Sequence, residues 1–270
     1  MKKLVVTALA CMLLLTGCGG AKTGDTAKTE DDPKEIKIGT MTIVEPIVNM
    51  LAEGLEKDGY KITPVLFDGN HLPATALSEG SVDGVILNHK PWMETFNKEN
   101  NTNLVMPEPY MYQGTNALYS NKYDDISQIP DGAKIAVPGD PINLDRSLRL
   151  LQGIGFIKLQ EGKEGMYTPV DIVENTKNIE IIETEITATV RSMDDVDALF
   201  CGAAYVKEAG YDHKHPLYFD PTNKDYPLGL IVNKGDEDKP WVKKVLEYQQ
   251  TQEFKDKFNE HFDQTYILYE

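Results

Sequence analysis

Cysteine is scarce in this sequence, with three among 270 residues. Cys11 and Cys18 fall near the amino terminus, so Cys201 alone belongs to the main body of the chain. A single cysteine excludes an internal disulfide there. Because Cys201 ends the apolar run 198–201, we expect a buried, small hydrophobic side chain rather than a nucleophile.

Positive charge is also scarce, since 27 Lys and Arg residues face 43 Asp and Glu residues and the formal net charge is −16. Phosphate backbones and anionic lipid surfaces are themselves negative, so this balance argues against electrostatic binding to either. We therefore predict no nucleic-acid partner, and a membrane contact that depends on something other than charge.

Short catalytic motifs are missing as well. The sequence contains no Gly-x-Ser-x-Gly, no Walker A segment and no His-Glu-x-x-His, so no nucleophile has a recognisable base beside it. His213 and His215 lie two residues apart near Asp212 without an obvious third ligand. We predict neither a metal site nor a cofactor, and a protein that is not an enzyme.

No hydrophobic run is long enough to span a bilayer. The apolar segment 4–15 follows Lys2 and Lys3, and about a dozen apolar residues are too few for a core of ~30 Å. The pattern is typical of a secretory signal peptide over residues 1–17. Cys18 follows Leu-Thr-Gly, which resembles the bacterial lipobox; the alternative is an ordinary signal with an incidental cysteine.

The lipobox interpretation places the mature protein on the extracytoplasmic face of the cell membrane, anchored by lipid on Cys18. Residues 18–35 lack apolar periodicity and are rich in Gly, Thr, Lys and Asp. Such a segment cannot bury enough surface to offset the entropy of ordering it, so we expect a flexible linker.

The remaining residues alternate short apolar runs with helical patterns, as in strand 36–39, helix 47–55 and strand 61–67. Repeated β-α-β with short connections predicts an α/β fold with largely parallel sheets. Two halves of similar size suggest a cleft between them, and ligands of such folds bind at that place.

The segment 136–146 runs from a predicted strand into a predicted helix. We expect Asn143 to cap this helix and Arg146 to lie near its third position. A cation there opposes the helix dipole, whereas free N–H groups and a guanidinium together suit a carboxylate or phosphate. The alternative is that Asp145 or another acid pairs with Arg146 and no ligand is involved.

The order Pro138-x-Asp-Pro-x-Asn-x-x-Arg146 resembles the methionine-type substrate-binding lipoproteins of ABC importers, the MetQ/NlpA family. The segments 88–92 (Asn-His-Lys-Pro-Trp), 155–159 and 194–198 continue the resemblance in order, and it covers about 36–245. No single motif is decisive, but their order and spacing together are strong evidence.

The resemblance implies a two-domain, periplasmic-binding-protein-like (type II) fold with a central ligand cleft and two crossover segments. The domains would be 36–115 with 228–270, and 116–227. The protein would be a monomer that captures a small, carboxylate-bearing, amino-acid-like solute by domain closure. It would deliver this ligand to an ABC permease with a cytoplasmic ATPase.

Family membership further implies ligand-binding residues. Arg146 would hold the carboxylate, with Asn143 beside it and His89 lining the cleft. We add three candidates whose contact with ligand is open: Asn70, His71 and Tyr205.

The chain also departs from the family pattern. Aliphatic residues fill 85–87, and Gly202 and Ala204 stand where the methionine-binding branch has asparagines. Lost polar contacts cost about 1–3 kcal/mol each, so we expect a different or altered ligand. The alternative is a degenerate family member that acts as a surface interaction or adhesion lipoprotein without a small ligand.

Overall fold

A computed structural model describes residues 32–270, which form one compact unit. The predicted signal peptide, Cys18 and most of the predicted linker lie outside the described residues. Among the residues described, no helix is both long and apolar enough to cross a membrane.

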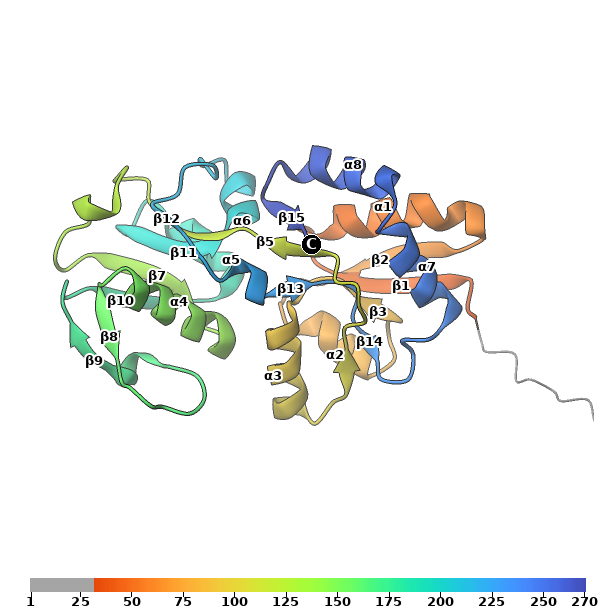
Figure 1. Cartoon of the computed structure of the whole chain (residues 1–270), viewed down its shortest axis with the longest axis horizontal. Coiled ribbons are helices and arrows are strands. Elements are labelled where there is room, and N and C mark those ends of the chain that lie inside the picture. The colour runs from red at the N-terminus through yellow and green to blue at the C-terminus, as the bar shows by residue number, and fades with distance from the viewer. Residues whose placement is uncertain (1–31) are drawn as a thin grey trace, which may run out of the picture. The chain divides into compact units, whose positions relative to one another are not determined.

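Helices and strands alternate along the chain (Figure 1). The strands are β1 (Glu35–Thr40), β2 (Lys61–Leu66), β3 (Gly84–Val85), β4 (Leu104–Val105), β5 (Tyr112–Gly114), β6 (Asn116–Tyr119), β7 (Lys134–Pro138), β8 (Ile157–Leu159), β9 (Ile172–Asn175), β10 (Glu180–Thr184), β11 (Ala198–Gly202), β12 (Tyr218–Phe219), β13 (Pro227–Leu228), β14 (Val232–Asn233) and β15 (Tyr266–Leu268). The α-helices are α1 (Glu45–Leu55), α2 (Leu72–Ser78), α3 (Lys90–Asn100), α4 (Pro141–Gly153), α5 (Ile186–Thr189), α6 (Ala203–Glu208), α7 (Pro240–Tyr248) and α8 (Gln252–Phe262).

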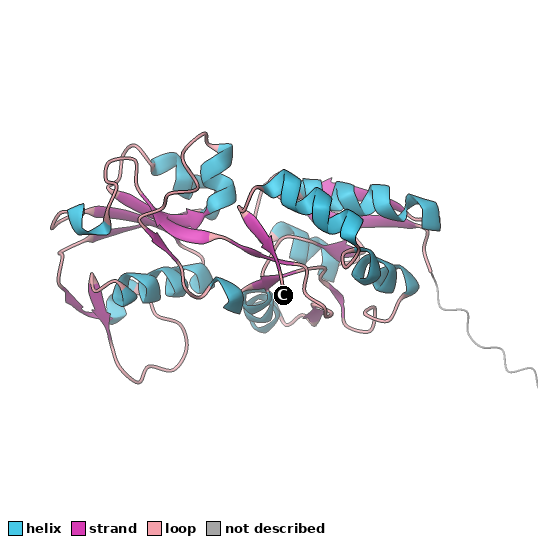
Figure 2. Cartoon of the chain, turned by 45° about the horizontal axis from the view of Figure 1, so that its top comes forward, coloured by secondary structure: helices cyan, strands magenta, loops and turns pink. Residues whose placement is uncertain are grey.

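The first group of elements, which we call lobe 1, has a parallel sheet in the order β2-β1-β3. Its buried side chains come from residues 36–112 and 228–262 and form one hydrophobic cluster. Small antiparallel sheets add β5 with β13 and β15, and β4 with β14. Figure 2 shows strands and helices layered together in this lobe.

Lobe 2 has a five-stranded sheet in the order β10-β7-β11-β6-β12. Strands β10, β7 and β11 are parallel, whereas β6 runs antiparallel to both of its neighbours. Two hydrophobic clusters, drawn from residues 117–206, cover the two faces of this sheet. Cys201 is one of the buried members, as we expected.

The α/β fold class is therefore confirmed, with parallel pairing at the centre of each lobe. The exact domain boundaries at 115/116 and 227/228 stay a prediction, although the chain passes between the two groups of buried residues near β5–β6 and near β13. The apolar runs 82–87 and 228–232 each predict a single strand, but β3 is shorter than the first run and the second is split into β13 and β14. Between these two strands, Ile231 forms an isolated antiparallel bridge to Val85.

Candidate functional site

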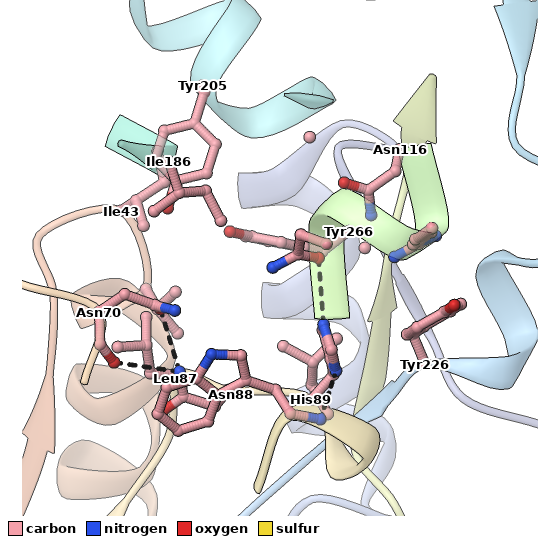
Figure 3. A pocket seen from close by; sticks show the side chains of 17 residues that line it. Ile43, Asn70, Leu87, Asn88, His89, Asn116, Ile186, Tyr205, Tyr226 and Tyr266 are labelled. Atoms are coloured by element: carbon pink, nitrogen blue, oxygen red, sulfur yellow. Dashed lines mark hydrogen bonds between the residues drawn. The ribbon is translucent and has the colours of Figure 1, made fainter. Parts of the chain in front are cut away.

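A cavity of about 80 Å³ lies between the lobes and is lined by residues of both. Figure 3 shows Asn70, Leu87, Asn88 and His89 of lobe 1 across from Ile186, Tyr205 and Asn116. Its complete lining comprises Ile43, Val44, Asn70, Leu87, Asn88, His89, Trp92, Gly114, Asn116, Asn143, Arg146, Ile186, Gly202, Tyr205, Tyr226, Leu228 and Tyr266. Apolar and aromatic side chains predominate, and none of these lining residues is a carboxylate.

Helix α4 carries two predicted site residues into this cavity, but it starts earlier than we predicted. Asp140, not Asn143, is the N-cap: its carboxylate accepts a hydrogen bond from the backbone N–H of Asn143. Pro141 occupies the first helical position, where its missing N–H costs nothing. Arg146 therefore lies in the second turn, so the helix N-terminus and the guanidinium do not form the single anion site that the sequence suggested.

Arg146 is also not free of internal partners, which corrects the central expectation. Its Nε donates to Asp220 over 2.5 Å and its Nη2 donates to Asn223 over 2.7 Å. Both members of this ion pair are buried, with exposed fractions of 3% for Arg146 and 4% for Asp220. The alternative that an acid pairs with Arg146 is thus confirmed, although the acid is not Asp145, which pairs with Arg149.

Arg146 is nevertheless one of the residues that line the cavity. Within the described chain, Nη1 donates no hydrogen bond, and Asp220 is not among the lining residues. Burial acts to lower the pKa of Arg146 and the ion pair with Asp220 opposes it, so the side chain stays charged. Asp220 and Asn223 thus hold Nε and Nη2 of the guanidinium, and Nη1 is left without a hydrogen-bond partner within the described chain.

His89 is the N-cap of α3, where its Nδ1 accepts a hydrogen bond from the backbone N–H of Trp92 over 3.1 Å. Burial, with a smaller contribution from Arg146, lowers the pKa of His89 to about 3. The imidazole is therefore neutral, and its remaining proton belongs on Nε2. This N–H donates to Oδ1 of Asn143 over 3.3 Å.

Asn143 continues this chain of hydrogen bonds into lobe 2. Its Nδ2 donates to both carboxylate oxygens of Asp140, over 3.0 and 2.9 Å. Burial raises the pKa of Asp140, while the bonds from Asn143 act against that rise. His89, Asn143 and Asp140 therefore form a continuous polar path across the cavity wall.

The other predicted residues divide into two groups. Asn70 and Tyr205 line the cavity, and Asn70 accepts hydrogen bonds from Asn88 through both its side-chain and main-chain oxygens. His71 does not line it; this exposed side chain borders a separate hollow beside Asp140 and Glu183. Contact of any of these residues with a ligand stays a prediction.

Several cavity residues escaped the sequence analysis. Tyr226 lies over Arg146, with its ring centroid 3.8 Å from the guanidinium carbon, and edge-on to His89 at 5.0 Å. Asp220 and Asn223 are more than 70 residues from Arg146, so no local pattern could have revealed their pairing. The turn sequence 220–223, Asp-Pro-Thr-Asn, was the available signal, but it marks a turn rather than a partner.

Comparison with known proteins decides the family. The family model described as NlpA lipoprotein matches residues 36–268. The chain belongs to the NlpA lipoprotein family.

Relatives of this NlpA-family chain include the D-methionine-binding lipoprotein MetQ of Escherichia coli O157:H7. It is 33% identical over 264 residues, which are 96% of this chain and 94% of the relative. The family resemblance drawn from the sequence is therefore confirmed.

Solved structures agree with this assignment and support the two-domain type II fold. The substrate-binding protein of a methionine transporter from Streptococcus pneumoniae is 30% identical with a TM-score of 0.81, covering 88% of this chain and 97% of its own. A nutrient-binding protein from Burkholderia cenocepacia, solved bound to methionine, is 29% identical with a TM-score of 0.79, covering 86% of this chain and 99% of its own.

Proposed function

We propose that this protein is the extracytoplasmic solute-binding component of an ABC importer, and that it binds a small amino-acid-like solute in the cavity between its lobes. Binding, not catalysis, is the activity that the site favours. Support comes from relatives named for methionine binding and methionine transport and from the chemistry of the cavity. The observation that carries the proposal is the buried Arg146, held by Asp220 with Nη1 left over.

The cavity suits a zwitterion. A carboxylate would accept hydrogen bonds from Nη1 of Arg146, in a place where the guanidinium is already fixed and loses little freedom on binding. Because Asp220 balances the charge of Arg146, the site as a whole is close to neutral, which suits a solute without net charge. Apolar side chains such as Ile43, Leu87 and Ile186 would contact the rest of the ligand.

Closure would be the signal to the permease. A ligand that touches both lobes stabilises the closed arrangement relative to the open one, which is a shift in population. Anchoring through a lipid on Cys18 would keep the protein beside the permease, and two or more acyl chains would make that anchoring stable. Replacement of Cys18 by Ser should release the protein from membranes, as measured by fractionation.

Isothermal titration calorimetry against a panel of amino acids and dipeptides tests the proposal. The informative variant is Arg146→Lys, because it keeps a cation beside Asp220 and removes the fork that would hold a carboxylate. We expect a loss of affinity of about 10- to 100-fold, the equivalent of one charge-assisted hydrogen bond.

The matched control is Arg149→Lys. Arg149 lies one turn further along α4, pairs with Asp145 and does not line the cavity. We expect its affinity to equal that of the unsubstituted protein. Absence of binding to every carboxylate ligand would overturn the proposal and favour a surface interaction protein without a small ligand.

A further inference from the structure

The hydrogen bond from His89 to Asn143 joins the two lobes directly. His89 stands at the start of α3 in lobe 1, and Asn143 lies in the first turn of α4 in lobe 2. Nε2 of His89 and Oδ1 of Asn143 are 3.3 Å apart. Figure 3 draws this bond at the wall of the cavity, beside Tyr226.

Each partner is oriented by its own lobe before the bond forms. The backbone N–H of Trp92 occupies Nδ1 of His89, which leaves the proton on Nε2 and points it at lobe 2. Asp140 binds the amide nitrogen of Asn143, which presents Oδ1 to lobe 1. A bond between two groups that are already oriented loses little side-chain entropy when it forms.

The donor of this bond, the Nε2–H group of His89, is uncharged. A protonated imidazole would stand close to the Arg146 guanidinium, and both that repulsion and burial favour the neutral form. A neutral donor pairs with a neutral amide acceptor, so the bond forms without burying an unpaired charge. The aromatic ring of Tyr226 packs against the His89 edge and against Arg146.

We propose that His89 and Asn143 form a latch between the lobes that stabilises the closed arrangement before any ligand binds. The two side chains are positioning residues that bind each other. They raise ligand affinity by raising the fraction of free protein that is closed. One net hydrogen bond corresponds to a change of about 2- to 10-fold in the open-to-closed ratio. The link to ligand affinity rests on the proposed function, whereas the latch itself is a property of the free protein.

The test measures distances between lobes in the full-length, ligand-free protein. Spin labels at Lys98→Cys on α3 and Glu161→Cys after β8 are both placed at exposed positions, and pulsed electron resonance gives the distribution of distances between them. His89→Asn keeps a good N-cap for α3 but is too short to reach Asn143. Asn143→Leu keeps the volume and removes the acceptor.

We expect each substitution to raise the open-to-closed ratio by about 2- to 10-fold, and the double variant to do no more than either single one, because all three remove the same bond. His261→Asn is the control, since it makes the same replacement at an exposed position on α8 that does not line the cavity. Circular dichroism confirms that each variant is folded.

Unchanged distance distributions in both single variants, or additive effects in the double variant, would overturn the latch. Calorimetry with methionine gives the second measurement: latch variants should lose affinity by the same factor as they lose closed protein. If the unsubstituted protein binds no amino acid, the proposed function fails. The distance measurement still shows whether the His89–Asn143 latch stabilises the closed arrangement.

Discussion

The two walls of the cavity are built in different ways. The wall from lobe 2 carries a formal charge, Arg146, whose position depends on Asp220 far along the chain. The wall from lobe 1 is neutral: His89 is held by the start of its own helix, and Asn88 by the neighbouring Asn70. The charged wall therefore depends on a contact between residues 74 apart in the sequence, whereas the neutral wall combines the local cap at His89 with a contact between Asn70 and Asn88, 18 residues apart.

The two walls are therefore expected to contribute to different properties, the charged wall to folding stability and the neutral wall to closure of the lobes. A buried ion pair is costly to break, because the surviving partner is left charged and without water. A neutral hydrogen bond at the surface of the cavity costs far less to lose. We expect substitutions in the charged wall to affect folding first, and substitutions in the neutral wall to affect closure and ligand affinity first.

The largest expected effect comes from Asp220→Ala. It leaves the buried guanidinium of Arg146 without its carboxylate, so the free energy of unfolding should fall by about 3–5 kcal/mol in urea titration. Asp225→Ala, on the same turn but outside this ion pair, should change it little. A loss below about 1 kcal/mol for Asp220→Ala would mean that the two walls do not differ in this way.

The second prediction concerns pH and the neutral wall. His89 has an ordinary pKa of 6.5 that falls to about 3 in the folded protein. Between these values the unfolded state binds more protons, so stability should decrease as pH falls from 6.5 towards 3. The slope from this residue is at most about 1.4 kcal/mol per pH unit.

Comparison of the unsubstituted protein with His89→Asn isolates this contribution from those of other groups, including Asp140, whose raised pKa acts in the opposite direction. Urea titrations at pH 7 and pH 5 give the measurement. An equal loss of stability in both proteins would show that His89 is hydrated in the folded state.

The third prediction adds a polar group to the charged wall. Gly202 has an ordinary helical-cap backbone with φ of −74°, and a side-chain carbon there would meet Asn116 Oδ1 at 3.4 Å, which is normal contact. Gly202→Asn should stabilise the protein by a few tenths of a kcal/mol as a better N-cap for α6. Its amide nitrogen should also strengthen binding of an amino acid by up to about tenfold, measured by calorimetry. Weaker binding would show that the bound ligand itself occupies the space next to residue 202.

The last prediction concerns Tyr226, which contacts residues of both walls. Tyr226→Leu removes the ring over Arg146 and should cost about 0.5–1 kcal/mol in thermal unfolding. Tyr226→Phe keeps the ring, and the hydroxyl makes no hydrogen bond within the described chain, so we expect no change. Equal losses in both variants would instead assign the effect to the hydroxyl.

Local signals predicted most elements of the fold. The helical patterns 47–55, 90–99, 241–249 and 253–262 and the apolar runs 36–39, 61–67 and 134–137 lie within a few residues of α1, α3, α7, α8, β1, β2 and β7. Short strands such as β5 and β12 were missed, because their residues pair with strands distant in sequence and carry no period of their own. The N-cap of α4 was misplaced by three residues because Asp140 and Asn143 both suit that position.

The candidate site was predicted less completely. Arg146, Asn143, His89, Asn70 and Tyr205 all line one cavity; the family resemblance pointed to the first three, and Asn70 and Tyr205 were further candidates. The resemblance did not predict the pairing of Arg146 with Asp220. An ion pair between residues 74 apart leaves no spacing pattern in the sequence.

The amino-acid sequence by itself determined the α/β class, the family and the residue types available for a carboxylate ligand, because hydrophobic periodicity and ordered motifs are local properties of the chain. Only the tertiary structure decided that the Arg146 guanidinium pairs with the carboxylate of Asp220, and that His89 donates a hydrogen bond to Asn143 across the cavity. Those contacts depend on which side chains folding brings within 3–4 Å, and separation along the sequence carries no information about that distance.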